Sequence, residues 1–198
     1  MKKSLTFLFA SLFVLLSCQC STIKIDKAHR EFVTLKGEAY PKTSTIYKNN
    51  ELLADSSKKA THLIVNKKTQ RLQVHANHLV LIDTPCCTGK RGKRTPSGKF
   101  NVTEKIKNKR STIFGRCYYK KKCVHRGDKR KCKRRYTRYV GSSLPYWMRL
   151  NDNGIGLHGS SSIRRYPASN GCIRLPHSIV SKVYYKTPKH TPVEIVYQ

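Results

Sequence analysis

Apolar and polar residues alternate in short runs from residue 62 onward. Three such runs follow one another closely, HLIVN, RLQVHA and HLVLID, over His62–Asn66, Arg71–Ala76 and His78–Asp83. Alternation with a period of two predicts strands with one buried face, and the polar residues between the runs predict turns. We therefore expect this region to form a meander of hairpins.

The remainder of the chain shows further strands and one convincing short helix. A block rich in Gly, Pro and Ser at residues 87–101 predicts a loop, and strand patterns resume at Phe100–Thr103 and Pro192–Tyr197. Apolar residues recur on one side of Pro176–Tyr185, which predicts a helix. The pattern as a whole indicates a mainly β domain over residues 61–198.

The N-terminus has the pattern of an export signal. Lys2 and Lys3 precede an apolar stretch that ends at Leu16 and is too short to span a bilayer comfortably. We predict a signal peptide at residues 1–17 and a location in the extracytoplasmic cell envelope, the periplasm. The sequence LLSC, which ends at Cys18, resembles the lipobox of bacterial lipoproteins. It predicts a lipid anchor in the membrane at Cys18, with ordinary cleavage as the alternative.

Residues 18–60 separate this leader from the alternating runs. They are polar, mixed in charge and weakly periodic, which predicts a tether between a membrane anchor and the domain. Short pairing segments such as Glu31–Leu35 are left open.

The charge is concentrated in the domain. The chain has 41 Lys and Arg against 10 Asp and Glu, and residues 105–140 alone hold sixteen basic residues and a single acid, Asp128. This basic segment predicts either a surface for phosphates, acidic sugars or lipid headgroups, or a solvated hairpin whose charge aids solubility. Nucleic acid would suit the same charge, but the export signal argues against that partner.

Apart from Cys18 and Cys172, which are considered separately, the chain has six cysteines: Cys20, Cys86, Cys87, Cys117, Cys123 and Cys132. Disulfides are the usual state of such thiols outside the cytoplasm. The spacing within the basic segment does not match a familiar zinc pattern, so we expect no metal and a hairpin pinned by one or two disulfides. The connectivity stays open.

Candidate chemistry lies in residues 144–176. His158 is followed by Gly159 and Ser160, and Cys172 comes fourteen residues after His158 within the string SNGCIR. A thiol nucleophile needs a nearby base, and a glycine before it allows the tight turn that points backbone amides at a developing oxyanion. Alternatively, such a Cys and His would be a disulfide partner and a buried core residue.

The same string closely resembles the signature of the L,D-transpeptidase family, the YkuD-type catalytic domain. That signature is a His-Gly pair followed, after a short spacer, by Ser-X-Gly-Cys-X-Arg. The matching residues are His158, Gly159, Ser169, Gly171, Cys172 and Arg174. The segment TPSGKF at Thr95–Phe100 also fits, and the resemblance covers residues 61–197. Asn170 stands where many members carry His, and the basic segment is more basic than usual.

The resemblance implies a β-sandwich with one or two short helices and a peptidoglycan enzyme. Cys172 would attack the amide before the terminal D-Ala of a tetrapeptide stem, form a thioester and pass the acyl group to a neighbouring stem, giving a 3→3 cross-link. His158 would act as base and acid, with a backbone carbonyl of Gly159 or Ser160 as its partner. No cofactor or metal is implied.

Further site residues follow from the same resemblance. Backbone amides of Gly171 and Cys172 would form the oxyanion site, and the substrate-binding candidates are Arg174, Ser169, Asn170, Tyr146 and Trp147. Core packing explains Tyr146 and Trp147 equally well. Two alternatives share the scaffold, an L,D-carboxypeptidase and an enzyme that attaches lipoproteins to peptidoglycan. A third alternative is a non-catalytic, basic module that binds the cell wall.

Overall fold

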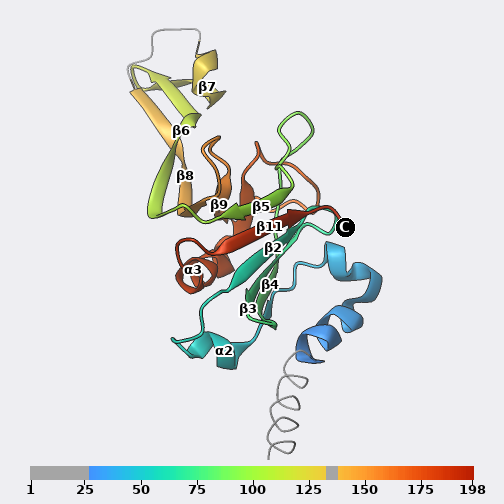
Figure 1. The fold of residues 1–198 in the computed structure, drawn as a ribbon. Coiled ribbons are helices and arrows are strands. Elements are labelled where there is room, and N and C mark those ends of the chain that lie inside the picture. Colours follow the sequence, from blue (N-terminus) through green and yellow to red (C-terminus); the bar gives the residue numbers. More distant parts are fainter. Residues whose placement is uncertain (1–26, 133–137) are drawn as a thin grey trace, which may run out of the picture.

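Two β-sheets packed face to face, with one helix against them, form the body of the protein (Figure 1). The computed structural model describes residues 27–132 and 138–198. The predicted signal peptide and the cysteines at positions 18 and 20 lie outside the described residues. The expected mainly β class is confirmed, and no helix of the described residues is long and apolar enough to cross a membrane.

The first sheet has the strand order β1-β4-β3-β2-β11-β5. Its strands are β1 (Tyr47–Lys48), β2 (His62–Asn66), β3 (Arg71–Ala76), β4 (Leu79–Pro85), β5 (Gly98–Asn101) and β11 (Pro192–Val196). The antiparallel pairs β2–β3 and β3–β4 confirm the predicted meander. The last strand, β11, inserts between β2 and β5, parallel to β2 and antiparallel to β5.

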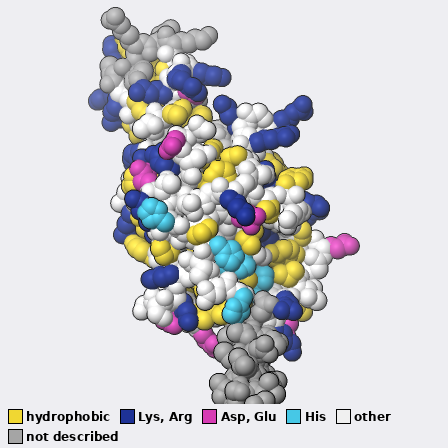
Figure 2. All heavy atoms as spheres, in the orientation of Figure 1, with side chains coloured by type: hydrophobic (Ala, Val, Ile, Leu, Met, Phe, Trp, Pro, Cys, Tyr) yellow, Lys and Arg dark blue, Asp and Glu magenta, His cyan; other side chains and the backbone are white. Residues whose placement is uncertain are grey.

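The second sheet has the order β10-β9-β8-β6-β7. Its strands are β6 (Glu104–Tyr119), β7 (Lys122–Asp128), β8 (Arg138–Arg149), β9 (Gly156–Ser160) and β10 (Ile173–Pro176). Strands β6 and β8 are long, and with β7 and the short helix η2 (Lys129–Lys131) they extend beyond the body as an arm (Figure 1). We define the arm as residues 110–132 and 138–143. Lys and Arg side chains gather over it (Figure 2).

The core lies between the sheets and beneath α3 (His177–Lys186). Helix α3 begins one residue later than predicted, and its three expected apolar residues, Ile179, Val180 and Val183, are buried. The cluster of buried apolar side chains at the core includes Leu63, Val65, Leu72, Val74, Leu157, Ile173, Leu175 and Val193. Burial on alternate positions of β2 and β11 matches the period that predicted them.

The segment before β2 is folded onto the domain, which corrects the prediction of a tether that continues to residue 60. Residues 27–36 are helical and are followed by η1 (Gly37–Lys42), β1 and α2 (Asn50–Ala54). Strand β1 pairs with β4, and the Lys186 ammonium of α3 donates hydrogen bonds to the carbonyls of Leu52, Asp55 and Lys58. Composition alone does not reveal these contacts, because their partners lie far along the chain.

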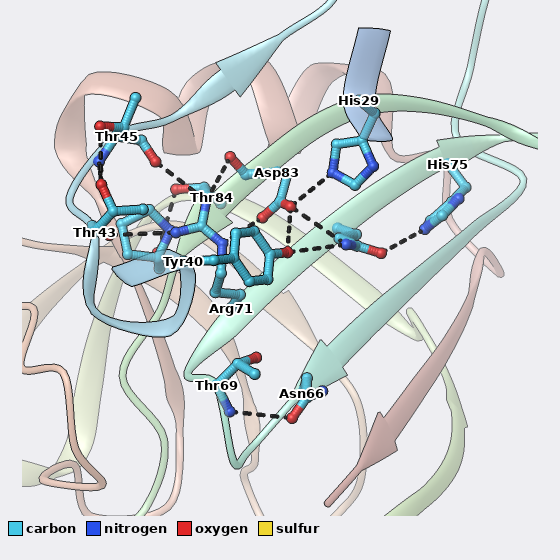
Figure 3. Close-up of polar contacts among 12 residues, drawn as sticks. His29, Tyr40, Thr43, Thr45, Asn66, Thr69, Arg71, His75, Asp83 and Thr84 are labelled. Carbon is cyan, nitrogen blue, oxygen red and sulfur yellow. Dashed lines mark hydrogen bonds and ion pairs between the residues drawn. The ribbon is translucent and has the colours of Figure 1, made fainter. Parts of the chain in front are cut away.

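A buried polar network fastens this segment (Figure 3). The Asp83 carboxylate, which has no exposed surface, contacts His29 Nε2 at 2.8 Å, accepts from the Tyr40 hydroxyl at 2.5 Å and pairs with Arg71 Nε at 2.7 Å. The other nitrogens of Arg71 donate to the carbonyls of Thr43 and Thr45. Burial alone would raise the pKa of Asp83, but the His29 hydrogen bond and the Arg71 charge outweigh it and lower that pKa.

A disulfide between Cys117 and Cys132 joins β6 to the end of η2. It confirms the prediction of a hairpin pinned by a disulfide within the basic segment. Cys86, Cys87, Cys123 and Cys172 are free thiols in the structure.

Replacing Asp83 by Leu should destabilise the protein, because Arg71 would stay buried without its charge partner. We expect a loss of about 3–5 kcal/mol in the free energy of unfolding, the usual cost of breaking a buried pair from one side. Urea denaturation at pH 7 measures it, and cleavage by trypsin at Lys36 and Lys42 should accelerate. The double variant Arg71→Leu/Asp83→Leu should lose less than the sum of the two single variants. Additive losses would contradict a direct coupling of the two residues.

Candidate active site

The pairing of β9 with β10 brings the predicted reactive residues together. These strands run parallel in a register that places His158 beside Arg174, and Cys172 immediately precedes β10. His158, Cys172 and Arg174 all line one cleft of about 620 Å³. The structure thus gathers in one place residues that the sequence linked only through a motif.

The walls of the cleft come from β8, from the base of the arm and from the loop before β9. They include Ile113, Phe114, Leu144, Trp147, Asn153 and Ile155. The Trp147 ring lies 6.3 Å from the His158 ring, centroid to centroid, and its Nε1 donates to Glu104 Oε2 at 3.0 Å. Trp147 is therefore a wall of the cleft with a fixed ring position, and its contact with substrate stays a prediction.

His158 is buried and is oriented by its own neighbour. The Gly159 carbonyl accepts a hydrogen bond from Nδ1 at 2.9 Å, so the neutral ring carries its proton on Nδ1 and keeps Nε2 as an acceptor. Burial lowers the pKa of His158 to about 4. The Gly159 hydrogen bond acts in the opposite direction and raises this pKa, whereas the charges of Arg174 and His177 lower it a little further. The ring is thus neutral, and able to take a proton, at physiological pH.

The Cys172 thiol is also held in its neutral form. Burial raises its pKa, and a backbone contact with Gly156 and the charge of Arg174 oppose this only in part. Its Sγ donates a weak hydrogen bond to the Gly154 carbonyl at 3.5 Å. The resting pair is therefore a thiol and an imidazole, and the reactive thiolate forms only when the proton is transferred.

The turn that presents Cys172 is fixed from two sides. Gly171 has a φ of 120°, and a Cβ at this position would lie 2.8 Å from Ile155 Cδ1, so glycine is required there. The buried Thr95 hydroxyl donates to the Gly171 carbonyl at 2.7 Å and accepts from Gly89 N at 2.8 Å. The Ser169 hydroxyl donates to the Cys172 carbonyl at 2.5 Å and accepts from Gly171 N at 3.0 Å.

These bonds bear on the roles that the motif suggested for two residues. The Gly171 amide was expected to face an oxyanion, but it donates to the Ser169 hydroxyl. Ser169 lines the cleft but is only 1% exposed, and its hydroxyl holds the turn, so its binding of substrate stays a prediction. Sequence reasoning did not single out Thr95 as a support of the nucleophile, although the TPSGKF segment contains the signal.

Tyr146 does not line the cleft but packs against the core, so of its two predicted roles the structure supports core packing. Its φ is 58°, and its ring packs edge-on against Tyr184 and Tyr185 of α3, at centroid distances of 5.5 and 6.2 Å. Successive side chains of a strand point to opposite faces, so Trp147 and its neighbour Tyr146 serve different sides of β8.

The remaining predicted site residues surround the cleft. Arg174, Asn170 and Ser160 line it, and the Ser160 hydroxyl accepts from Ser162 N at 3.1 Å. Gly159 lies beneath α3, where a Cβ would come within 2.9 Å of Val180 Cγ1. The loop at residues 87–90 braces the site through paired backbone bonds between Cys87 and Arg174, both of 3.0 Å.

Comparisons with known proteins show the family of this chain. The family model of the L,D-transpeptidase catalytic domain, YkuD, matches residues 60–195. The chain is 31% identical over 142 residues to a Bacillus subtilis (strain 168) protein named "Putative L,D-transpeptidase YqjB", covering 68% of this chain and 70% of that one.

Solved structures share the fold. An Enterococcus faecium L,D-transpeptidase is 23% identical with a TM-score of 0.52, covering 70% of this chain and 50% of that one. The LD transpeptidase LdtMt1 in complex with imipenem is 19% identical with a TM-score of 0.52, covering 68% of this chain and 57% of that one. This chain thus spans between 50% and 57% of the length of these two structures. With the family model matched over most of the folded residues, the chain belongs to the L,D-transpeptidase catalytic domain family.

Proposed function

We propose that this protein is a peptidoglycan L,D-transpeptidase that forms 3→3 cross-links through an acyl-enzyme on Cys172. The observation that carries the proposal is the shared cleft of Cys172 and His158, in which the Gly159 carbonyl holds Nδ1 and leaves Nε2 as the proton acceptor. Membership of the family and the fold support the same reading.

In the first half-reaction, His158 Nε2 takes the Cys172 thiol proton as Sγ attacks the carbonyl that precedes the terminal D-Ala of a stem peptide. The carbonyl oxygen gains negative charge in the tetrahedral intermediate. We assign the stabilising contact to the Cys172 N–H, because the Gly171 N–H is engaged with Ser169. The C–N bond then breaks, His158 returns the proton to the leaving amine, and D-Ala departs from a thioester.

In the second half-reaction, an amine of a neighbouring stem attacks the thioester carbonyl. His158 removes a proton from that amine and delivers it to Sγ as the C–S bond breaks, which restores the free thiol and completes the new amide bond. The thioester conserves the acyl energy, so the balance needs no nucleotide.

The charges of the cleft suit an anionic stem peptide. Lys109, Arg149 and Arg174 line it, whereas Asp152 is its one acidic lining residue within the described chain. Arg174 lies on the strand that begins at the nucleophile, where its guanidinium fork can hold a donor carboxylate. We place Asn170, which is exposed at the rim, on the donor stem as well.

We further propose that the enzyme works outside the cytoplasm and is attached to the membrane by a lipid at Cys18. The short apolar stretch and the lipobox-like LLSC support this placement.

Replacing Cys172 by Ala should abolish acylation. Intact-protein mass spectrometry of the full chain, incubated with a disaccharide tetrapeptide or with imipenem, should show adducts on the wild type and none on Cys172→Ala. The matched control is Cys123→Ala, which removes another free thiol, far from the cleft on the arm. It should keep both adducts.

The products of the same experiment identify the acceptor. Cross-linked dimers support the transpeptidase, whereas tripeptide alone indicates an L,D-carboxypeptidase, and transfer only to an added protein amine indicates lipoprotein attachment. A folded wild type with a titratable Cys172 thiol and no adduct would rule out the enzyme and favour a basic module that binds the wall.

The acylation rate should stay nearly constant from pH 7 to pH 5 and fall only towards pH 4. The reason is the lowered pKa of His158, about 4, which keeps Nε2 unprotonated over this range. A histidine of ordinary pKa, about 6.5, would lose roughly tenfold of its base form by pH 5.5. Stopped-flow acylation by imipenem measures the profile, and an acid limb centred between pH 6 and 7 contradicts the burial argument.

Thr95→Val should slow acylation and destabilise the fold, because it leaves the Gly171 carbonyl and the Gly89 amide without their buried partner. We expect a loss of about 1–3 kcal/mol in unfolding free energy and an acylation rate lower by about tenfold or more, since misplaced nucleophiles react slowly. Thr95→Ser keeps the hydroxyl and should restore most of the rate. Equal rates in all three proteins would show that Thr95 does not position Cys172.

A further inference from the structure

The arm carries a strong positive charge that the acids of residues 27–132 and 138–198 leave largely unmatched. Its exposed basic residues are Arg110, Arg116, Lys120, Lys121, Lys122, Arg126, Arg130, Lys131 and Arg138. The two acids nearest in sequence already have partners: Glu104 contacts Lys109, Trp147 and Arg149, and Asp128 pairs with Arg130. Figure 2 shows the resulting concentration of Lys and Arg side chains over this end of the molecule.

Strand register sorts the side chains of the arm onto two faces. Arg116 lies directly opposite Arg126 of β7 and Val140 of β8, and Tyr118 lies opposite Arg138. Because residues directly opposite each other in an antiparallel pair share a face, three arginines from three strands project from the same side. We call this side the arginine face: Arg116, Arg126 and Arg138, with Tyr118.

The other face of the arm is covered. Cys117 is fully buried there, opposite His125 and Tyr139, and its disulfide to Cys132 holds η2 against the sheet. The Lys129 ammonium of η2 lies 5.0 Å from the centre of the Tyr139 ring, and His125 Nε2 bonds the Asp128 carbonyl at 2.9 Å. Arg116, Arg126 and Arg138 are exposed, so among the described residues the arginine face is the open side of the arm.

The arrangement of the arginine face favours an anionic ligand. Like charges directly opposite each other destabilise a sheet, and among the described residues neither Arg116 nor Arg126 forms an ion pair. The Arg138 guanidinium lies 5.0 Å from the centre of the Tyr118 ring, which orients it. An anion bound by both Arg116 and Arg126 would attract the two guanidinium groups and offset their mutual repulsion.

We propose that the arginine face docks a linear, phosphate-bearing polymer of the cell envelope. A phosphate group presents several oxygens around a tetrahedral centre, so forks from β6 and β7 can bind it together, whereas a carboxylate accepts one fork bidentately. Exposed basic residues follow β6 from Arg110 through Arg116 to Lys120 at the β6–β7 turn, and this spread fits a repeating anion rather than a single small one.

The position of the arm favours a wall polymer over a lipid surface. Figure 1 shows the helix of residues 27–36 at one end of the molecule and β7 at the other. An anchor that precedes residue 27 would hold the first end at the membrane and direct the arm away from it. Ser111, Thr112, Ile113 and Phe114, at the base of the arm, line the catalytic cleft, so a polymer on the arginine face would keep the cleft beside the wall.

The test uses the full chain and fluorescently labelled linear polyphosphate in an anisotropy titration. Arg116→Gln/Arg126→Gln should weaken binding about tenfold or more, because charge-assisted contacts are lost. The slope of log affinity against log salt concentration should also become shallower by about one for each arginine removed. Arg116→Lys/Arg126→Lys keeps the charge without the forks and should fall in between. The matched control, Lys182→Gln/Lys189→Gln, removes the same charge at exposed positions on and after α3 and should bind as the wild type does.

Other outcomes overturn the proposal. Equal weakening in the matched control would assign binding to bulk charge. If binding depends on the arginines but occurs with phosphatidylglycerol vesicles and not with polyphosphate, the partner is a membrane. Equal affinity for polyglutamate would show that the face does not prefer phosphate. Tighter binding of oligothymidylate than of polyphosphate would indicate nucleic acid. Near-ultraviolet circular dichroism confirms that each variant is folded. Because the assay involves no acyl transfer, its failure is distinguishable from failure of the proposed catalysis.

Discussion

The register between β9 and β10 is the constraint on which the site depends. Leu157, Ile173 and Leu175 point into the core with no exposed surface, while the paired His158 and Arg174 point towards the cleft. Side chains alternate along strands, so a slip of one residue would bury the reactive groups and expose the leucines. Burial of these apolar side chains in the core thereby fixes the positions of His158 and Arg174 in the cleft. Apolar residues of α3 pack against the same core.

Burial also sets the protonation state of the reacting pair. It lowers the pKa of His158 and raises that of Cys172, so both groups rest in their neutral forms. The Gly159 carbonyl selects the tautomer, and the Thr95 and Ser169 hydroxyls fix the turn around Gly171. A neutral thiol reacts far more slowly than a thiolate, and transfer of its proton to His158 makes Cys172 a nucleophile when substrate is present.

The charged side chains at the two ends of the molecule differ in burial and in pairing. At one end, the charges of Arg71 and Asp83 are buried but fully paired, and they fasten residues 27–48 to the first sheet. At the other end, the charges of the arm are exposed, and the described acids leave most of them unmatched. Paired buried charges hold structure, whereas unmatched exposed charges are available to a partner.

The sequence by itself determined the elements whose partners are close along the chain. The bounds of β2 and β3 follow from alternation, α3 is displaced by one residue, and the glycine-framed Cys172 and His158 identify the family. Only the tertiary structure decided that Tyr146 packs on α3 while Trp147 lines the cleft, and that the Ser169 hydroxyl holds a turn. It also decided that residues 27–54 fold onto the domain, because Asp83 meets His29 across 54 positions of sequence. Local patterns report which face of a strand is buried, but they carry no information on which distant residue covers it.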